Sequence, residues 1–348
     1  MSIPYLRSMN KIGILFGLLS GLVFTSCQNN ATQIIRGEAQ GTSYFIKFFE
    51  GEQNITKGDV DSILQHFDNA VSWYNPNSLL SHYNAADTFV HLVDTFGYFS
   101  NVYYHGFRFQ NKTQGYFNPG LLPFFQALKK NQGVLSAAEL DSLMALGSMT
   151  DNKVKADINP DNHLMELDLW KDQHEQLDFN ANAQGFSVDL LAEFLQKKGI
   201  GSFLVEIGGE MRVGIEKPNG TAWEVGIENP VMERSGNIQE VLQLNNWSLA
   251  TSGTYRKFVE GKHHIINPLT GKQTNHNLVS VTVIAELCAD ADALATAFIA
   301  MGKDKSMEWL QTQGSGKEYA FFIENINGEW VSSYSPGFEK FIQKDHVQ

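Results

Sequence analysis

The stretch Ser187-Val-Asp-Leu-Leu-Ala-Glu-Phe-Leu-Gln-Lys-Lys-Gly199 decides the fold class of this 348-residue chain. Its apolar residues recur at helical spacing, and it ends in a glycine, a common helix stop. A strand at Ser202–Ile207, the turn Gly208-Gly209 and a returning strand at Met211–Ile215 follow directly. The two glycines suit a tight hairpin turn, and equally a close approach of the backbone to a ligand. A helix that leads into a hairpin predicts an α+β protein with a largely antiparallel sheet.

Helical and strand patterns also occur on both sides of this stretch. Apolar runs predict further strands at Ser43–Phe49, Lys153–Ile158, Leu164–Leu169, Ala222–Glu228, Val279–Ala285, Tyr319–Ile323 and Glu329–Ser333. Apolar residues three and four apart predict helices at Asp59–Trp73, Thr95–Lys112, Leu121–Asn131 and Cys288–Met301, the last one stopping at Gly302. The sequence contains no internal repeat and no linker rich in proline, glycine or serine, so we expect residues 36–342 to form one domain.

The start of the last helix, Cys288-Ala-Asp-Ala-Asp-Ala-Leu-Ala-Thr-Ala297, carries the strongest chemical signal. Asp292 and Thr296 stand four residues apart and therefore share one helix face. A carboxylate above a hydroxyl, with small alanines around them, suits a hard cation that takes oxygen ligands, Mg2+ first. We expect this metal site at the protein surface. The alternative is an ordinary helix N-terminus with early acids, Asp290 and Asp292.

Composition indicates a folded, acidic protein. Hydrophobic residues make up 43% of the chain and charged residues 18%, values typical of a globular protein and not of a disordered one. Nucleic acid is not an expected partner, because phosphate binding needs clustered Lys and Arg while this chain has a net charge of −12 and no basic run.

Residues 1–26 have the pattern of an export signal. Arg7 and Lys11 precede an apolar run from Ile12 to Phe24, which is shorter than the roughly 20 residues that a spanning helix needs. Small residues then lead to Cys27. No later segment is long and apolar enough to cross a membrane.

A cysteine directly after such a run resembles a bacterial lipoprotein signal, although Phe24 stands where that pattern prefers leucine. The resemblance implies that Cys27 is lipidated, with palmitate as an acyl group, and that residues 27–35 tether a membrane-anchored protein facing the periplasm. The alternative is a plain secretory signal cut near Ser26. With Cys27 modified, Cys288 has no disulfide partner. We expect Cys288 to be a buried small hydrophobe and not a reactive thiol.

Four separated segments, taken together, resemble the FAD:protein FMN transferase family, also called the ApbE family. The segments are Leu177–Asp189 followed by Leu204–Glu210; Trp223–Pro230; Thr251–Phe258 with His264–Gly271; and Ser280–Ala285 running into Ala291–Thr296. Any one of these motifs is weak, but the ordered set is specific and spans about residues 36 to 340. The resemblance implies an ApbE-like fold, with a largely antiparallel sheet and packed helices.

The resemblance also implies an activity: Mg2+-dependent transfer of FMN from FAD to a threonine or serine hydroxyl of an acceptor protein, with release of AMP. A divalent metal suits this reaction, because cleaving a pyrophosphate builds negative charge on its oxygens. The acceptors implied are flavoprotein subunits of membrane redox complexes. Two alternatives stay open, a Mg2+-dependent FAD hydrolase that gives FMN and AMP, and a flavin-binding lipoprotein without catalysis.

The resemblance assigns site residues one by one. Its metal site falls on the side chains of Asp292 and Thr296 and on the backbone carbonyl of Ala181, whereas Ala295 stands where some members have a second acid. Its FAD contacts fall on Gln40, Tyr74, Tyr116, Phe117, Asn118, Asp178, Gln184 and Ile266.

Three of these FAD contacts depart from the family pattern, since Gln40, Asn118 and Gln184 replace the usual Met, Asp and Lys. The lysine missing at Gln184 removes a positive charge near the phosphates, and Arg256 is a candidate to supply one. His264 is the candidate general acid or base, because it lies beside the flavin-contact segment and histidine titrates near neutrality. His263 next to it is the alternative.

Overall fold

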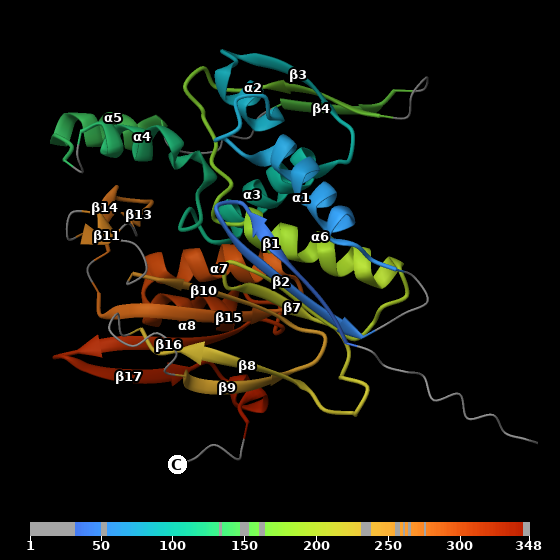
Figure 1. Cartoon of the computed structure of the whole chain (residues 1–348). Coiled ribbons are helices and arrows are strands. Elements are labelled where there is room, and N and C mark those ends of the chain that lie inside the picture. Colours follow the sequence, from blue (N-terminus) through green and yellow to red (C-terminus); the bar gives the residue numbers. More distant parts are fainter. Residues whose placement is uncertain are drawn as a thin grey trace, which may run out of the picture.

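An eight-stranded sheet forms the centre of the computed structural model, which describes residues 32–49, 54–131, 134–146, 153–159, 164–230, 238–254, 258–259, 262–263, 266–274 and 276–343 (Figure 1). In spatial order its strands are β1 (Thr32–Ala39), β2 (Thr42–Phe49), β6 (Phe203–Ile207), β7 (Glu210–Val213), β10 (Ser248–Gly253), β15 (Leu278–Ala285), β16 (Tyr319–Ile326) and β17 (Glu329–Tyr334). Every neighbouring pair in this order is antiparallel, as the hairpin pattern of the sequence predicts.

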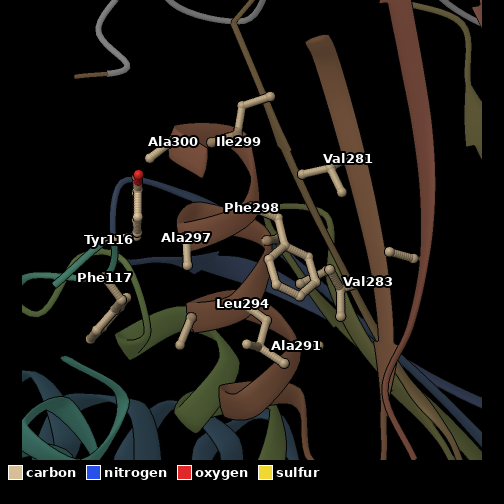
Figure 2. Packing of buried hydrophobic residues seen from close by; sticks show 14 of the residues in the cluster. Tyr116, Phe117, Val281, Val283, Ala291, Leu294, Ala297, Phe298, Ile299 and Ala300 are labelled. Carbon is tan, nitrogen blue, oxygen red and sulfur yellow. The ribbon is translucent and has the colours of Figure 1, made fainter. Parts of the chain in front are cut away.

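Two helices cover one face of this sheet, α6 (Ala183–Lys197) and α7 (Cys288–Met301). On α7, Phe298 points toward Val281 and Val283 of β15, and the three side chains belong to one buried hydrophobic cluster (Figure 2). The opposite face, which includes Ile284, packs against the hairpin of β8 (Trp223–Glu228) and β9 (Ile238–Leu244) and the short helix η2 (Phe338–Phe341). Alternate residues of β15 therefore belong to different cores, as the pleat of a strand requires.

A smaller unit packs on the far side of α6 (Figure 1). It contains α1 (Lys57–Val71), α2 (Leu79–Ala85), α3 (Tyr98–Lys112) and a three-stranded antiparallel sheet in the order β3 (Phe89–Asp94), β5 (Met165–Trp170), β4 (Lys153–Ile158). Phe186 and Leu190 of α6 contact this unit, whereas Val188 and Leu191 contact the core under β2 and β6. Since α6 contributes side chains to both cores, it connects the two parts of the molecule.

The remaining described elements are short. They are η1 (Pro119–Leu121), α4 (Leu122–Lys130), α5 (Ala137–Leu146), α8 (Lys303–Thr312), β11 (Phe258–Val259), β12 (Lys262–His263), β13 (Ile266–Asn267) and β14 (Lys272–Gln273). The indole of Trp309 on α8 lies edge-on to Phe298, with 5.3 Å between ring centroids, and donates to the carbonyl of Lys112 at 2.8 Å. This contact fixes α8 against the end of α3.

Most elements expected from periodicity are confirmed. The quoted stretch forms α6, which begins at Ala183, four residues earlier than predicted, and ends before Gly199 at φ +79°. The predicted residue 288–301 helix is α7, followed by Gly302. The sequence did not predict the strands β1, β3 and β9 to β14 or the helices α2, α5, α8, η1 and η2. It also placed residues 32–35 in the tether, but they belong to β1 and pair with β2.

Two expectations about membranes and thiols can be compared with the described residues. None of the helices in this part of the chain is long and apolar enough to cross a membrane. Cys288 is completely buried, and burial raises the pKa of its thiol, so it acts as a small core residue as expected. Cys27 lies outside the described residues, and its lipidation stays a prediction.

The junction of α6 and α7 is unusually close. The buried Asp189 carboxylate accepts hydrogen bonds from the backbone N–H groups of Cys288 at 3.0 Å and Ala289 at 2.9 Å, and the Arg212 guanidinium donates to it at 2.7 Å. A β-carbon at Gly185 would lie 2.6 Å from the Cys288 carbonyl oxygen and 2.8 Å from the Cα of Ala289. Only glycine permits this approach at position 185.

We therefore predict that Gly185→Ala destabilises the protein. The added methyl group has backbone atoms as neighbours on α7, so relief requires the helices to separate, and overpacking of this kind costs about 1–3 kcal/mol. The free energy of unfolding, measured by urea denaturation, checks this. Gly58→Ala in α1 is the matched control, because its methyl group would meet only the Thr56 hydroxyl at 3.6 Å. It should not destabilise the protein, because Gly58 lies in the exposed first turn of α1, where alanine fits a helix at least as well as glycine. An unchanged free energy of unfolding in Gly185→Ala would contradict the close contact between α6 and α7.

Candidate metal and flavin site

The α7 helix places Asp292 and Thr296 on one face, as predicted. The Asp292 Oδ2 accepts a hydrogen bond from the backbone N–H of Gly185 at 3.1 Å, and the Thr296 Oγ1 lies 3.5 Å from the Ser252 Oγ of β10. The predicted surface location is wrong, because Asp292 is only 7% exposed. The first turn of α6 covers the start of α7, which periodicity within α7 alone does not reveal.

A second buried carboxylate lies beside Asp292, and the sequence reading gave it no role. Glu210 begins β7 and is 7% exposed. Burial is the main cause that raises the pKa of Asp292 well above its usual range, and repulsion from the Glu210 carboxylate raises it further. The alternation of side chains along a strand could have indicated this location of Glu210. Residues two apart in β7 face the same side of the sheet, and Arg212 bonds to Asp189 on the side that the helices cover.

The chemistry of these donors fits an oxygen-coordinated cation. A cation beside Asp292 would stabilise its charged form and offset the repulsion from Glu210. Within the described residues, no three side chains of His, Cys, Asp or Glu group as a metal cluster. Hydroxyl and carbonyl oxygens, such as those of Thr296 and Ala181, and water would therefore complete the shell, which is typical of Mg2+.

Asp178, Tyr74 and the segment after Asn118 meet at the start of the loop that leads to α6. The Asp178 backbone N–H donates to the Pro119 carbonyl at 2.8 Å, and the Asp178 carboxylate accepts from the backbone and side-chain amides of Asn180 at 2.8 and 3.2 Å. The same Asn180 Nδ2 lies 3.5 Å from the Tyr74 hydroxyl. Burial raises the pKa of Asp178 to about 6, although these amide bonds oppose the shift.

The Tyr74 ring is suited to stacking. It is 68% exposed and lies against Trp73, with ring centroids 4.0 Å apart and planes inclined by 32°. An exposed aromatic face held by a second ring offers a ready surface for a planar ligand such as a flavin or an adenine.

Three neighbouring predicted contacts have different surroundings. The Tyr116 hydroxyl accepts from Lys305 Nζ at 2.6 Å, and the Asn118 Oδ1 accepts from the Gly120 N–H at 2.9 Å. Phe117 is only 1% exposed and packs edge-on to Phe109 in the cluster that also contains Ala297 (Figure 2). A flavin contact at Phe117 would therefore come from its backbone.

Gln40, Gln184 and Ile266 complete the described part of the predicted set. Gln40 sits in a turn at φ +54°, and its Nε2 donates to the Ser187 Oγ at 2.5 Å. Gln184 borders the β6–β7 turn, because a β-carbon at Gly208 would lie 3.1 Å from the Gln184 Nε2. Ile266 is half-buried in β13, which lies against α7.

The glycine pair Gly208-Gly209 has φ angles of +66° and +111°, so the hairpin interpretation is confirmed. The turn also borders Gln184 and Glu210, whose Oε2 would lie 3.4 Å from a β-carbon at Gly208. The turn therefore adjoins the candidate metal site, and the segment from Asp178 to Gly185 links the candidate metal ligands to the candidate flavin contacts.

The predicted general acid or base, His264, lies outside the described residues, and so does Arg256. Both assignments stay predictions. For the alternative His263, the structure describes the backbone in β12, where it pairs with Phe258.

Comparison with known proteins identifies relatives along nearly the whole described chain. The sequence pattern of the ApbE family matches residues 40–321. The FAD:protein FMN transferase of Vibrio cholerae is 29% identical over 311 residues, which cover 84% of this chain and 89% of the relative. The protein of the same name from Haemophilus influenzae is 26% identical, covering 94% and 98%. A solved structure, the flavin transferase ApbE from Vibrio cholerae, superimposes with a TM-score of 0.75 at 25% identity, covering 89% of this chain and 99% of the other.

We predict that Asp178 gives stability a specific pH dependence. Its folded pKa is about 6, against an ordinary value of 3.8, so the folded state binds more protons than the unfolded state between these values. The contribution of Asp178 to the free energy of unfolding therefore falls as the pH rises from about 4 to 6, and it is constant above pH 6. Asp178→Asn should remove this fall, measured as the difference in unfolding free energy between variant and wild type across pH 4–7. The exposed Asp304→Asn is the control, and parallel curves for all three proteins would contradict the prediction.

Proposed function

This chain belongs to the ApbE family, and we propose that it transfers FMN from FAD to a threonine or serine hydroxyl of an acceptor protein, with Mg2+ as cofactor and AMP as second product. Relatives named FAD:protein FMN transferase match most of its length. The observation that carries the proposal is the buried Asp292 carboxylate, held by the Gly185 amide and placed beside Glu210.

The reaction balances without an oxidant or reductant. The acceptor hydroxyl oxygen attacks the phosphorus of the FMN half of FAD, forming a new P–O bond. The bond between that phosphorus and the bridging oxygen breaks, and AMP leaves with this oxygen. The proton of the acceptor hydroxyl is released to a general base, for which His264 is the candidate.

In this proposal the described residues form two groups, one that binds the metal and one that binds the rings of FAD. Asp292, Thr296 and the Ala181 carbonyl would hold the Mg2+ ion, whose positive charge would offset the negative charge that builds on the phosphate oxygens. The Gly185 amide fixes one oxygen of Asp292, so the carboxylate is oriented before any ligand arrives. Tyr74 would pack on a ring of FAD, and the Asp178 carboxylate would accept from its amino or hydroxyl groups.

One incubation distinguishes the candidate functions. The mature protein is mixed with FAD, Mg2+ and a threonine-containing acceptor peptide, and the products are separated. AMP together with a flavin-labelled peptide supports the transferase. AMP with free FMN and an unlabelled peptide would identify a hydrolase, and bound but intact FAD would identify a flavin-binding protein without catalysis.

We predict that Asp292→Asn abolishes this reaction without unfolding the protein. The amide oxygen still accepts from Gly185, but the negative charge that would bind the cation is lost. The rate of AMP release should fall at least about a hundredfold, because a bound metal stabilises the transition state by several kcal/mol. The melting temperature should not fall, since the amide keeps the hydrogen bond from Gly185 and carries no charge for Glu210 to repel.

The matched control for this experiment is Asp141→Asn, which changes an exposed carboxylate on α5. It should release AMP at the wild-type rate. If Asp292→Asn remained fully active, even in the presence of EDTA, the metal proposal would be wrong.

We further propose that the protein is a lipoprotein of the bacterial membrane that faces the periplasm and modifies subunits of membrane redox complexes. The support for the anchor is the apolar run from Ile12 to Phe24, which small residues separate from Cys27. Cys27→Ser should leave the protein without an acyl group and either unprocessed or released into the soluble fraction, as measured by fractionation and mass spectrometry of the N-terminus. A mature N-terminus elsewhere, without acyl mass, would refute the anchor.

A further inference from the structure

Three polar side chains from three separate elements meet beside the candidate metal site. His105 of α3 lies between them: its Nδ1 is 3.1 Å from the Asn182 Nδ2, and its Nε2 is 2.9 Å from the Asp290 Oδ1. Asn182 is completely buried and His105 is 7% exposed. Polar groups at such depth are costly unless they are paired, so this network restricts how α3, α6 and α7 pack together.

The partners determine the protonation of His105. With the Asn182 amide nitrogen facing the ring, as placed in the structure, Nδ1 is assigned as the acceptor and Nε2 as the N–H that donates to Asp290. Burial lowers the pKa of His105, in agreement with a neutral ring. The ring also stacks on Phe109 at 4.3 Å and meets the edge of Phe186 at 4.9 Å. Its orientation is therefore set from every side.

Both partners of His105 flank residues of the metal site. Asn182 directly follows Ala181, and Asp290 stands two residues before Asp292. Asn182 occupies the N-cap position of α6, yet its side chain makes no capping bond to that helix. Its amide is bonded to His105 instead. The start of α6 is thus held by His105 on one side and, through the Gly185 amide, by Asp292 on the other.

We propose that His105 and Asn182 are positioning residues that hold the Ala181 carbonyl and the Asp292 carboxylate at the separation a divalent cation requires. The inference rests on the proposed metal site. Neither side chain needs to touch the ion, because each acts on the backbone next to a ligand. Outer partners of this kind typically change metal affinity by 10–100-fold when they are removed.

The test measures cation binding in the absence of turnover. Mn2+, which takes the same oxygen ligands as Mg2+, is titrated into the whole mature protein without FAD, and the free ion is followed by electron paramagnetic resonance. His105→Phe keeps the aromatic stack on Phe109 but removes both hydrogen bonds. We expect it to weaken Mn2+ binding about tenfold and to raise the half-saturating Mg2+ concentration, with little change in the KM for FAD.

A second variant separates positioning from stability. His105→Phe leaves the buried Asn182 amide unpaired, whereas the double variant His105→Phe/Asn182→Leu fills the site with apolar groups. We expect the double variant to regain thermal stability but not Mn2+ affinity. Tyr83→Phe is the control, because it removes a buried hydrogen bond to Glu175 away from this site and should leave Mn2+ affinity unchanged.

Recovery of Mn2+ affinity in the double variant would overturn the proposal, and so would a tenfold loss in Tyr83→Phe. Either result would mean that affinity follows stability alone. Asp292→Asn tests the premise separately: unchanged Mn2+ binding in that variant would refute the metal site, and the positioning role with it.

Discussion

The structure depends above all on the placement of one carboxylate, that of Asp189. It accepts the first two backbone N–H groups of α7, and Arg212 of β7 donates to the same group. A helix N-terminus attracts negative charge, and here that charge comes from another helix, so the bond fixes α6, α7 and the sheet relative to one another. Burial raises the pKa of Asp189, whereas its three donors oppose that shift. This junction therefore also positions Asp292 and Thr296, the candidate metal ligands on α7.

The strand β7 gives the site its electrostatic character. Arg212 and Glu210 are two residues apart, and each lies near a buried aspartate of the helical layer. The pair of Arg212 with Asp189 joins opposite charges and holds the fold together. Glu210 and Asp292 bring like charges together, which opposes folding and favours a cation. Two residues of one strand thus differ in role: Arg212 stabilises the fold through Asp189, whereas Glu210 repels Asp292 and would favour the proposed cation.

The sequence predicted the elements with strong periodicity and missed those that depend on tertiary contacts. The amphipathic α6, the helix from Cys288 and the hairpin at Gly208 were predictable, because each has a local pattern and a glycine stop. The strand β10 was not, since Ser248–Gly253 contains small residues that become a strand only between β7 and β15. The burial of Asp292 was equally hidden, because it results from α6 lying over α7 and not from the sequence of α7 itself.

Charge in the described site also bears on the order in which ligands bind. Asp178, Glu210 and Asp292 bring three carboxyl groups to this region, and Gln184 carries no charge to offset them. The diphosphate of FAD would be repelled by Glu210 and Asp292 when both are ionised, and this repulsion is strong where water is excluded. A divalent cation bound there would reverse the sign of the local charge and attract the phosphates. If the proposed metal site is correct, the metal would enter before FAD or together with it, and the cation that attracts the phosphates would also offset the repulsion between Glu210 and Asp292.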